Sequence, residues 1–258
     1  MTQTAKQVST EVYDVLKESR IDGNTLYLPE KQLDRKLYQD VNAALTRMGG
    51  KWNRKSKGHV FPVSPTTALA SILDTGNAPA KNPMNFYATP EHIAERMAAC
   101  ISGSTDYILE PSAGTGAIAL AIRNHIEHYK IDAWLDCCEL VQGFQEHLHV
   151  LGFHLVASDF LDYHPTHQYS FIAMNPPFTS EHDPLAYIAH IEHAWSLLAP
   201  DGLLMAIAPG GFAFREDQRI QRFRALVEEH GSWESLEDGA FKESGTGIRT
   251  VLIEMRKG

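Results

Sequence analysis

The tetrapeptide Asn175-Pro176-Pro177-Phe178 combines residue types that can hold a planar amine. It follows a hydrophobic run, residues 169–174, that predicts a buried strand. Two consecutive prolines cannot continue a sheet ladder, because neither has an N–H to donate and both have a fixed φ. The strand is therefore expected to end in a stiff turn with an amide, carbonyls and an aromatic ring. Two acceptors can grip an –NH2 group while the ring stacks on its heterocycle, although Asn before proline also forms ordinary turns.

A glycine-rich turn lies earlier in the chain, in residues 106–116 (DYILEPSAGTG), between a predicted strand and a predicted helix. Gly114 and Gly116 allow the backbone to approach a ligand closely at a strand end. The turn lacks the Gly-Lys-Ser/Thr of a phosphate-binding loop, and Ala-Ile-Ala after Gly116 departs from a dinucleotide fingerprint. The remaining interpretation is a loop around the amino-acid part of a nucleoside-like cofactor, where Glu110 can receive a cationic group.

Acidic residues follow the next two predicted strands. Glu139 can accept hydrogen bonds from both hydroxyls of a ribose, the role that dinucleotide-binding folds give to an acidic residue at a strand end. Asp159 can hold an adenine amino group while Phe160 packs on the ring. A solvated carboxylate and an Asx turn are the structural alternatives. Their shared position at strand ends is what a cofactor cleft requires.

Strand and helix patterns alternate over the second part of the chain. Strands are predicted at 107–109, 133–138, 155–157, 171–174, 203–208 and 249–255, and helices at 116–128, 143–151 and 185–198. This alternation predicts an α/β fold with a mostly parallel sheet and helices on both faces. Before it, a helix at 4–20, a strand at 25–28, a helix at 31–48, a hairpin at 51–62 and a helix at 65–73 predict a small α+β module. With a linker at 74–83, the expected domains are residues 1–80 and 81–258.

Charge is unevenly distributed between these two regions. The net charge is −9, but residues 1–80 hold 11 Lys and Arg against 8 Asp and Glu, whereas the remainder holds 12 against 24. Cations and rings interleave in the predicted hairpin, which suits phosphate contacts, although a solvated charged hairpin is the alternative. The expected nucleic-acid contacts are Lys51, Trp52, Arg54, Lys55, Lys57 and His59.

Composition excludes several classes. With 43% hydrophobic and 21% charged residues, and no apolar run near the ~18 residues of a membrane span, the chain is expected to be soluble and without a membrane partner. The first residues do not form a secretory signal, and three cysteines without a CxxC pair support neither a disulfide framework nor a zinc site. The paired histidines at 125/128 and 190/193 lack a third ligand, so no metal is expected. We expect a reduced, cytoplasmic protein.

Residues 84–258 resemble the class I S-adenosylmethionine-dependent methyltransferases that act on amino groups, and most of all the DNA adenine-N6 methyltransferases. The motifs occur in the family's gamma order: a closing segment at 86–90 (FYATP), the glycine loop, Glu139, Asp159, the Asn-Pro-Pro-Phe turn and a late loop at 241–250. Gamma enzymes usually carry a long target-recognition domain after the catalytic turn. This sequence has none there, so the resemblance implies short or relaxed sequence specificity.

The resemblance implies a Rossmann-like fold, S-adenosyl-L-methionine as cofactor, and methylation of adenine N6 in duplex or single-stranded DNA by base flipping, as in restriction–modification. Asn175 oxygen and the Pro176 carbonyl would accept the amine N–H bonds, Pro177 would stiffen the turn and Phe178 would stack on the base. Methylation of an RNA base (adenine N6 or guanine N2), of a protein glutamine amide, and non-catalytic nucleic-acid binding are the alternatives. The implied cofactor residues are Tyr87, Thr89, Pro90, Glu110, Pro111, Ser112, Ala113, Gly114, Gly116, Glu139, Leu140, Asp159, Phe160 and Asn175.

Overall fold

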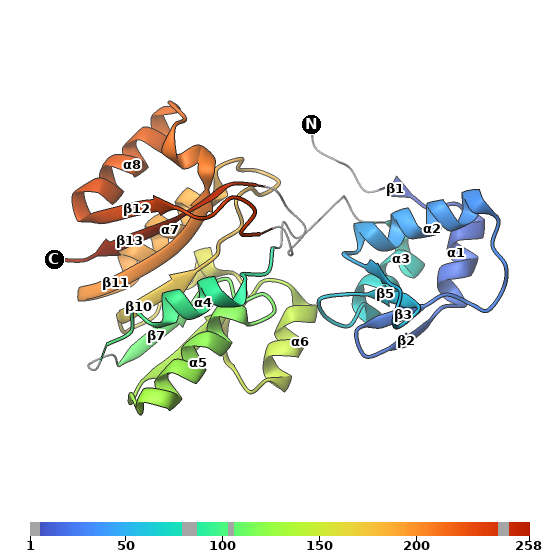
Figure 1. Cartoon of the computed structure of the whole chain (residues 1–258), viewed down its shortest axis with the longest axis horizontal. Coiled ribbons are helices and arrows are strands. Elements are labelled where there is room, and N and C mark those ends of the chain that lie inside the picture. The colour runs from blue at the N-terminus through green and yellow to red at the C-terminus, as the bar shows by residue number, and fades with distance from the viewer. Residues whose placement is uncertain (1–5, 79–86, 103–105, 242–247) are drawn as a thin grey trace. The chain divides into compact units, whose positions relative to one another are not determined.

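The computed structural model of the protein describes residues 6–78, 87–102, 106–241 and 248–258. The chain forms two compact units, Met1–Phe86 and Tyr87–Gly258, which we call the N-terminal unit and the C-terminal unit (Figure 1). The division lies a few residues after the boundary expected from the sequence.

The C-terminal unit is built on a seven-stranded sheet with the order β12-β13-β11-β10-β7-β8-β9. The five strands from β11 to β9 pair in parallel, and β13 runs antiparallel to β11 and β12. The predicted α/β fold with a mostly parallel sheet is therefore confirmed. The strands are β7 (Tyr107–Glu110), β8 (Trp134–Cys138), β9 (His154–Ala157), β10 (Tyr169–Met174), β11 (Leu198–Pro209), β12 (Gly231–Ser235) and β13 (Thr250–Arg256).

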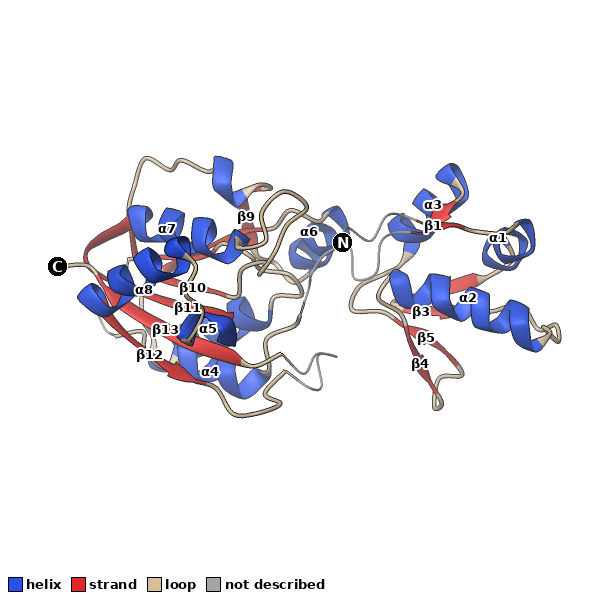
Figure 2. Cartoon of the chain, turned by 90° about the horizontal axis from the view of Figure 1, so that it is seen from above, coloured by secondary structure: helices blue, strands red, loops and turns tan. Residues whose placement is uncertain are grey.

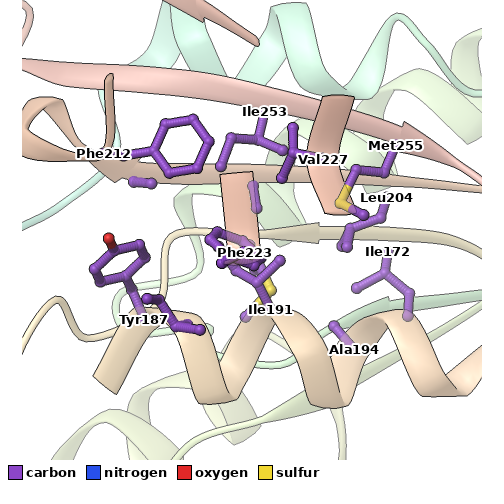
Figure 3. Close-up of a cluster of buried hydrophobic side chains, with 14 of the residues drawn as sticks. Ile172, Tyr187, Ile191, Ala194, Leu204, Phe212, Phe223, Val227, Ile253 and Met255 are labelled. Atoms are coloured by element: carbon purple, nitrogen blue, oxygen red, sulfur yellow. The ribbon is translucent and has the colours of Figure 1, made fainter. Parts of the chain in front are cut away.

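Helices cover both faces of this sheet because its central strands are apolar on both sides. Along β10, Phe171 and Ala173 pack with one cluster, while Ile172 and Met174 pack with the other. This follows from the two-residue period of side chains in a strand. The first cluster includes α4 (Glu91–Ala98) and α5 (Ala117–Tyr129), and the second includes α7 (Ala186–Leu197) and α8 (Gln218–His230), as Figure 3 shows for the second. Helix α6 (Gln142–Val150) packs with α5 through Leu148, and the short 3-10 helices η1 (Phe160–Asp162) and η2 (Gly210–Ala213) follow β9 and β11.

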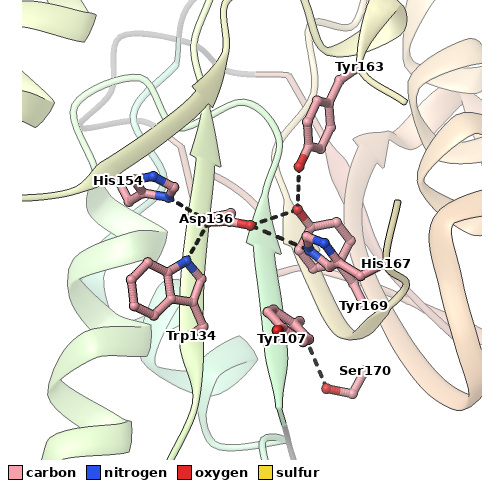
Figure 4. A network of polar contacts seen from close by, with 8 residues as sticks. All are labelled: Tyr107, Trp134, Asp136, His154, Tyr163, His167, Tyr169 and Ser170. Carbon is pink, nitrogen blue, oxygen red and sulfur yellow. Dashed lines mark hydrogen bonds and ion pairs between the residues drawn. The ribbon is translucent and has the colours of Figure 1, made fainter. Parts of the chain in front are cut away.

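A buried carboxylate joins three strands of the sheet. Asp136 of β8 is 2% exposed and accepts hydrogen bonds from Trp134 Nε1, His154 Nδ1 and the Tyr169 hydroxyl, each at 2.8 Å (Figure 4). Tyr163 extends the network through its hydroxyl, 2.8 Å from that of Tyr169. Burial and these hydrogen bonds raise the pKa of Tyr169, so it acts as a neutral donor. The network fixes β8 against β9 and β10.

Replacing Asp136 with asparagine should lower the free energy of unfolding by about 2–4 kcal/mol, because an amide cannot accept all three hydrogen bonds and its N–H groups would face donors. Chemical denaturation at neutral pH measures this loss. Asp132→Asn, at an exposed position, is the control and should change the free energy by less than about 0.5 kcal/mol. Equal stability of the two variants would contradict a structural role for the network.

The N-terminal unit has its own hydrophobic core and a four-stranded antiparallel sheet with the order β2-β3-β5-β4. Asp34 caps the start of its second helix by accepting from two backbone N–H groups, and Gly49, with φ +94°, follows the end of that helix. Figure 2 shows the β4–β5 hairpin, predicted from the sequence, beside this helix. The elements are β1 (Lys6–Gln7), α1 (Thr10–Lys17), β2 (Arg20–Asp22), β3 (Thr25–Tyr27), α2 (Arg35–Arg47), β4 (Lys51–Asn53), β5 (Gly58–Val60), α3 (Thr66–Thr75) and β6 (Asn77–Ala78).

Two predicted boundaries in this unit were wrong. The helix expected at 4–20 is confined to α1, because Lys6–Gln7 pairs with Asn77–Ala78 and Arg20–Asp22 pairs with β3. The first part of the expected linker is regular structure as well, because residues 74–75 belong to α3 and residues 77–78 form β6. The rest of that linker, residues 79–83, lies outside the described residues. Within the described ranges, no helix is both long and apolar enough to cross a membrane.

Candidate active site

The structure brings the predicted strand-end residues to one edge of the sheet. Strands β10, β7, β8 and β9 are neighbours and run parallel, so their carboxyl ends lie together. Glu110 ends β7, Glu139 follows β8, and Asn175 follows β10. Ligands of open α/β sheets bind at this edge, where the order of strands reverses. In this sheet β7 is the first strand of the series, and the chain continues to β8 on one side and later to β10 on the other.

The glycine loop is shaped by its two glycines. Gly114 and Gly116 have φ values of +54° and +81°, a region that side chains with a Cβ rarely adopt. A Cβ at Gly116 would also lie 3.0 Å from Leu148 of α6. The predicted loop residues Pro111, Ser112 and Ala113 complete the turn, and Ala113 N–H donates to the Cys138 carbonyl at 3.0 Å. The loop is thus fastened to the end of β8.

Glu139 fastens the same loop with its side chain. One carboxylate oxygen accepts from Gly114 N–H and the other from Val141 N–H, both at 2.7 Å. The residue is 7% exposed, and burial raises its pKa although the backbone N–H groups oppose this. Each oxygen retains a further lone pair, so hydroxyl groups of a ligand can still be accepted. The sequence predicted the ligand role, but not this contact with the loop.

Glu110 is an unusual buried acid. It is 1% exposed, and one carboxylate oxygen has no hydrogen-bond partner among the described residues. Burial raises its pKa well above the ordinary value; a backbone hydrogen bond from Ala119 opposes the shift, and the charge of Glu139 adds to it. A buried polar atom without a partner costs free energy, and a cationic ligand group would relieve that cost. The position therefore fits a cofactor with an ammonium group.

Replacing Glu110 with glutamine should raise the free energy of unfolding by about 1–3 kcal/mol at pH 8, because an amide stays neutral, whereas burial of the carboxyl group at this pH costs either a desolvated charge or the binding of a proton. The raised pKa means that the folded protein binds this proton more tightly than the unfolded chain does. Wild-type stability from this group is present at low pH and is lost as the pH rises through the raised pKa. Denaturation at several pH values should therefore show a gain that shrinks on acidification, whereas the control Glu127→Gln, at an exposed position of α5, should leave the free energy of unfolding unchanged.

The catalytic turn is held by the segment before α4. Asn175 Nδ2 donates to the Tyr87 carbonyl at 2.9 Å and to the Thr89 hydroxyl at 3.1 Å. A carbonyl oxygen can only accept, so the amide must present its nitrogen to this segment. With both amide hydrogens donated, the Asn175 oxygen is the part of the side chain left to accept from a ligand. Thr89 is 8% exposed, so it is positioned to orient Asn175 from within the protein.

The neighbours of Asn175 complete a compact turn. Pro176 is buried, whereas Pro177 and Phe178 are half-buried, and Phe178 packs against both hydrophobic clusters of the sheet. Beyond the turn, Asp183 accepts from Arg219 Nη1 at 2.7 and 2.9 Å. This ion pair ties the following loop to α8, and it could not be predicted from local patterns because the partners are 36 residues apart.

The remaining predicted cofactor residues differ in exposure. Leu140, after Glu139, is 68% exposed and offers an apolar surface at the strand end, and Pro90 precedes α4. Asp159 accepts from Leu161 N–H at 2.9 Å, which makes it the first residue of an Asx turn, and it is exposed. Phe160 was expected to pack on an adenine ring, but it is 3% exposed and lies in the core with its ring centroid 4.7 Å from that of His193. That expectation is wrong, because the turn at Asp159 directs the ring inward.

In the N-terminal unit, the predicted nucleic-acid residues are exposed with one exception. Trp52 is 47% exposed, and the cations Lys51, Arg54, Lys55 and Lys57 are exposed too. His59 is completely buried, with Nε2 2.9 Å from Asn42 Oδ1, and burial lowers its pKa. The prediction that His59 contacts phosphate was wrong, because it faces α2. Of the late loop predicted at 241–250, residues 242–247 lie outside the described ones.

Known proteins are similar to this chain in sequence or in fold. The family model described as methyltransferase small domain matches residues 93–226. Release factor glutamine methyltransferase of Escherichia coli (strain K12) is 33% identical over 239 residues, which are 90% of this chain and 78% of that protein.

Solved structures agree on the fold. A class I S-adenosylmethionine-dependent methyltransferase from Listeria monocytogenes matches with a TM-score of 0.57 and 16% identity, over 67% of this chain and 62% of that one. The M protein of type I restriction enzyme EcoKI matches with a TM-score of 0.54 and 15% identity, over 95% of this chain and 56% of that one. This chain thus spans less than two thirds of either protein. The family match and the similarity to the glutamine methyltransferase identify the chain as a member of the methyltransferase small domain family, with the class I fold and S-adenosyl-L-methionine as its methyl donor.

Proposed function

We propose that the protein methylates the exocyclic N6 amine of adenine in DNA. The observation that carries this proposal is the orientation of Asn175, whose nitrogen is held by the Tyr87 carbonyl and Thr89 while its oxygen remains to accept. An acceptor fixed in this way suits an –NH2 group, which has two hydrogens to donate. The Pro176 carbonyl, in the same rigid turn, would accept the second one.

The chain promotes the reaction by positioning the amine. The N6 lone pair of adenine is delocalised into the ring, so the free base is a weak nucleophile. Hydrogen bonds to Asn175 oxygen and the Pro176 carbonyl would draw the nitrogen towards tetrahedral geometry and localise that lone pair. Bound S-adenosyl-L-methionine supplies a methyl group on a sulfonium cation. Phe178, half-buried beside the turn, would stack on a base that has left the duplex.

Different residues at the strand ends would bind different parts of the cofactor. Glu110, with its unpartnered oxygen, would take the ammonium group, and the glycine loop would lie along the amino-acid part. Glu139 would accept from the ribose hydroxyls with its remaining lone pairs. Leu140 would cover one face of the adenine, with Asp159 at its amino group. Tyr87, Thr89 and Pro90 would close the cleft from the side of α4.

The N-terminal unit favours a nucleic-acid substrate. Its residues 1–80 carry a small excess of cations, although the whole chain has a net charge of −9. Exposed cations gather at the tip of the β4–β5 hairpin, where Arg54, Lys55 and Lys57 lie within four residues. Such a cluster next to an exposed aromatic ring is typical of surfaces that contact phosphates. Binding should therefore weaken as salt rises, and neutralising these three residues should reduce that dependence.

A second candidate substrate is the side-chain amide of a protein glutamine. The 33% identity over 90% of this chain with a release factor glutamine methyltransferase favours it. A carboxamide nitrogen resembles the adenine amine, because it is planar, carries two hydrogens and has a delocalised lone pair. The same pair of acceptors would serve it. The two candidates therefore differ in what the N-terminal unit binds, while the chemistry at Asn175 is shared.

Transfer of a labelled methyl group separates the candidates. Purified protein is incubated with labelled S-adenosyl-L-methionine and one of four substrates: duplex DNA, single-stranded DNA, RNA or a protein extract depleted of nucleic acid. Digestion to nucleosides or amino acids then identifies the product. We expect N6-methyldeoxyadenosine from DNA. Label confined to methylglutamine, or to a base of RNA, would overturn the proposal.

A further inference from the structure

We propose that the N-terminal unit binds unpaired nucleotides by stacking their bases on Trp52 and Tyr38. The inference deepens the proposed function and rests on it, because it concerns the strand state of a nucleic-acid substrate. We call Tyr38, Asn42 and Trp52 the aromatic stripe. The stripe is formed by residues of a helix and of the edge strand of a sheet. The charges near it would suit any phosphate-binding surface, so it is the two rings that favour unpaired nucleotides.

The aromatic stripe lies on the face of the small sheet that α2 covers. Trp52 of β4 and His59 of β5 are directly paired across the hairpin, and their ring centroids are 5.2 Å apart, so both side chains project to the same side. His59 Nε2 lies 2.9 Å from Asn42 Oδ1, so this side is the one that α2 covers. Tyr38 is one helical turn before Asn42, on the same side of α2. The stripe therefore runs from α2 to the outermost strand of the sheet, β4.

The rings at both ends of the stripe are partly exposed to solvent, whereas His59, the neighbour of Trp52, is buried. Trp52 is 47% exposed and Tyr38 is 36% exposed, but His59, which lies beside Trp52 and contacts Asn42 of α2, is completely buried. Burial lowers the pKa of His59, so the residue beside Trp52 is neutral and packs against its ring. A large ring that is partly exposed and held by a packed neighbour offers a flat surface on which a base can stack, and every base has such a face.

Cations lie beyond the stripe where a nucleic-acid backbone would continue. The hairpin turn presents Arg54, Lys55 and Lys57, all exposed. Its shape is fixed because Asn53 Oδ1 accepts from Lys55 N–H at 2.8 Å and from Ser56 N–H at 3.1 Å. Figure 2 shows the hairpin extending beyond the helices of the unit. This charge complementarity selects a polyanion, rather than an apolar protein partner, as the occupant of the stripe.

Aromatic stacking selects the strand state. In a duplex, each base face is already covered by its neighbours, and a protein reaches only base edges and phosphates. Rings can stack on bases only where the strand is single or locally opened. Removing the rings should thus weaken single-strand binding selectively, whereas removing the cations should weaken binding to both forms.

Fluorescence anisotropy of the full chain with a labelled 20-nucleotide DNA, single-stranded or annealed, tests the proposal. Replacing a ring that stacks on a base with alanine typically costs about 1–3 kcal/mol, which corresponds to about 5-fold or more in affinity. We therefore expect Trp52→Ala and Tyr38→Ala each to weaken single-strand binding about 5-fold or more, and to change duplex binding by less than about 2-fold. Trp52→Phe keeps an aromatic ring and should retain most of the affinity. This variant distinguishes the loss of stacking from misfolding of the hairpin. Tyr129→Ala, at a 63% exposed ring on α5, is the matched control and should have no effect.

Equal losses for single strand and duplex, or no loss with either variant, would overturn the proposal. Binding of a protein to the aromatic stripe that single-stranded DNA does not displace would overturn it as well. Failure of the proposed function is a separate result: label would then be absent from adenine in the transfer assay, whatever Trp52 does to binding. Adenine methylation that is unchanged in Trp52→Ala, with unchanged affinity, would contradict only the inference about the stripe.

Discussion

Replacing Asn175 with alanine should reduce the rate constant for methyl transfer by about 10³-fold or more, with the dissociation constant of S-adenosyl-L-methionine changed by less than about 3-fold. The variant loses the oxygen that would accept from the target amine, while Glu110, Glu139 and the glycine loop are untouched. Single-turnover transfer gives the rate constant, and isothermal titration calorimetry gives the affinity. Asn124→Ala, at an exposed position of α5, is the matched control and should behave as wild type.

A graded variant tests how Asn175 is oriented. Thr89→Val keeps the shape of the side chain but removes the hydroxyl that accepts from Asn175 Nδ2. We expect a loss of about 10-fold in the rate constant, since the Tyr87 carbonyl still holds one amide hydrogen. Thr89→Ser should restore most of the rate. Loss of cofactor affinity in Asn175→Ala with an unchanged rate constant at saturation would place Asn175 in a cofactor-binding role and contradict this account.

Replacing Glu139 with alanine should weaken S-adenosyl-L-methionine binding by about 100-fold, which corresponds to about 2.7 kcal/mol. The variant removes a carboxylate that anchors Gly114 and Val141 through two 2.7 Å hydrogen bonds and would also accept from the ribose. Hydrogen bonds to a charged group contribute about 1.5–3 kcal/mol each, so the loss of one ligand contact and of the loop's shape accounts for the expected size.

The control and the pH dependence sharpen this test. Glu127→Ala on α5 removes an exposed glutamate and should leave the affinity unchanged. Burial raises the pKa of Glu139, so the proton that abolishes its acceptor role binds at a higher pH than at an exposed glutamate. Calorimetry on wild type should therefore find weaker cofactor binding on acidification, and this component should be absent in Glu139→Ala. An affinity within about 3-fold of wild type at neutral pH would contradict the assignment.

The sheet could be predicted because its strands are short apolar runs that alternate with helical patterns. The expected strands at 171–174 and 203–208 lie within β10 and β11, where both faces are buried. Strand β12 was not predicted because Gly231–Ser235 lies at the edge of the sheet, pairs with a strand on one side only and has mostly exposed residues without an apolar pattern. Its pairing with β13 is a tertiary effect that no local pattern encodes.

The residue types of the cleft could be predicted from the sequence, but their contacts could not. Asn175 and Tyr87 are 88 residues apart, so their hydrogen bond depends on how the segment before α4 crosses the strand ends. The same limit explains His59, which stands in a basic segment yet is buried through its contact with Asn42. The burial of Phe160 could not be predicted either, because the direction of its ring depends on the turn at Asp159.

The central claim is that the amine held at Asn175 belongs to adenine in DNA, and one competition measures it directly. Wild-type protein receives limiting S-adenosyl-L-methionine with a trideuterated methyl group, together with equal concentrations of adenine-containing DNA and a glutamine-containing protein substrate. Mass spectrometry of the digested mixture then counts the methyl groups on each. The account predicts deuterated N6-methyldeoxyadenosine as the main product, absent with Asn175→Ala. Deuterium carried mainly by glutamine would contradict it.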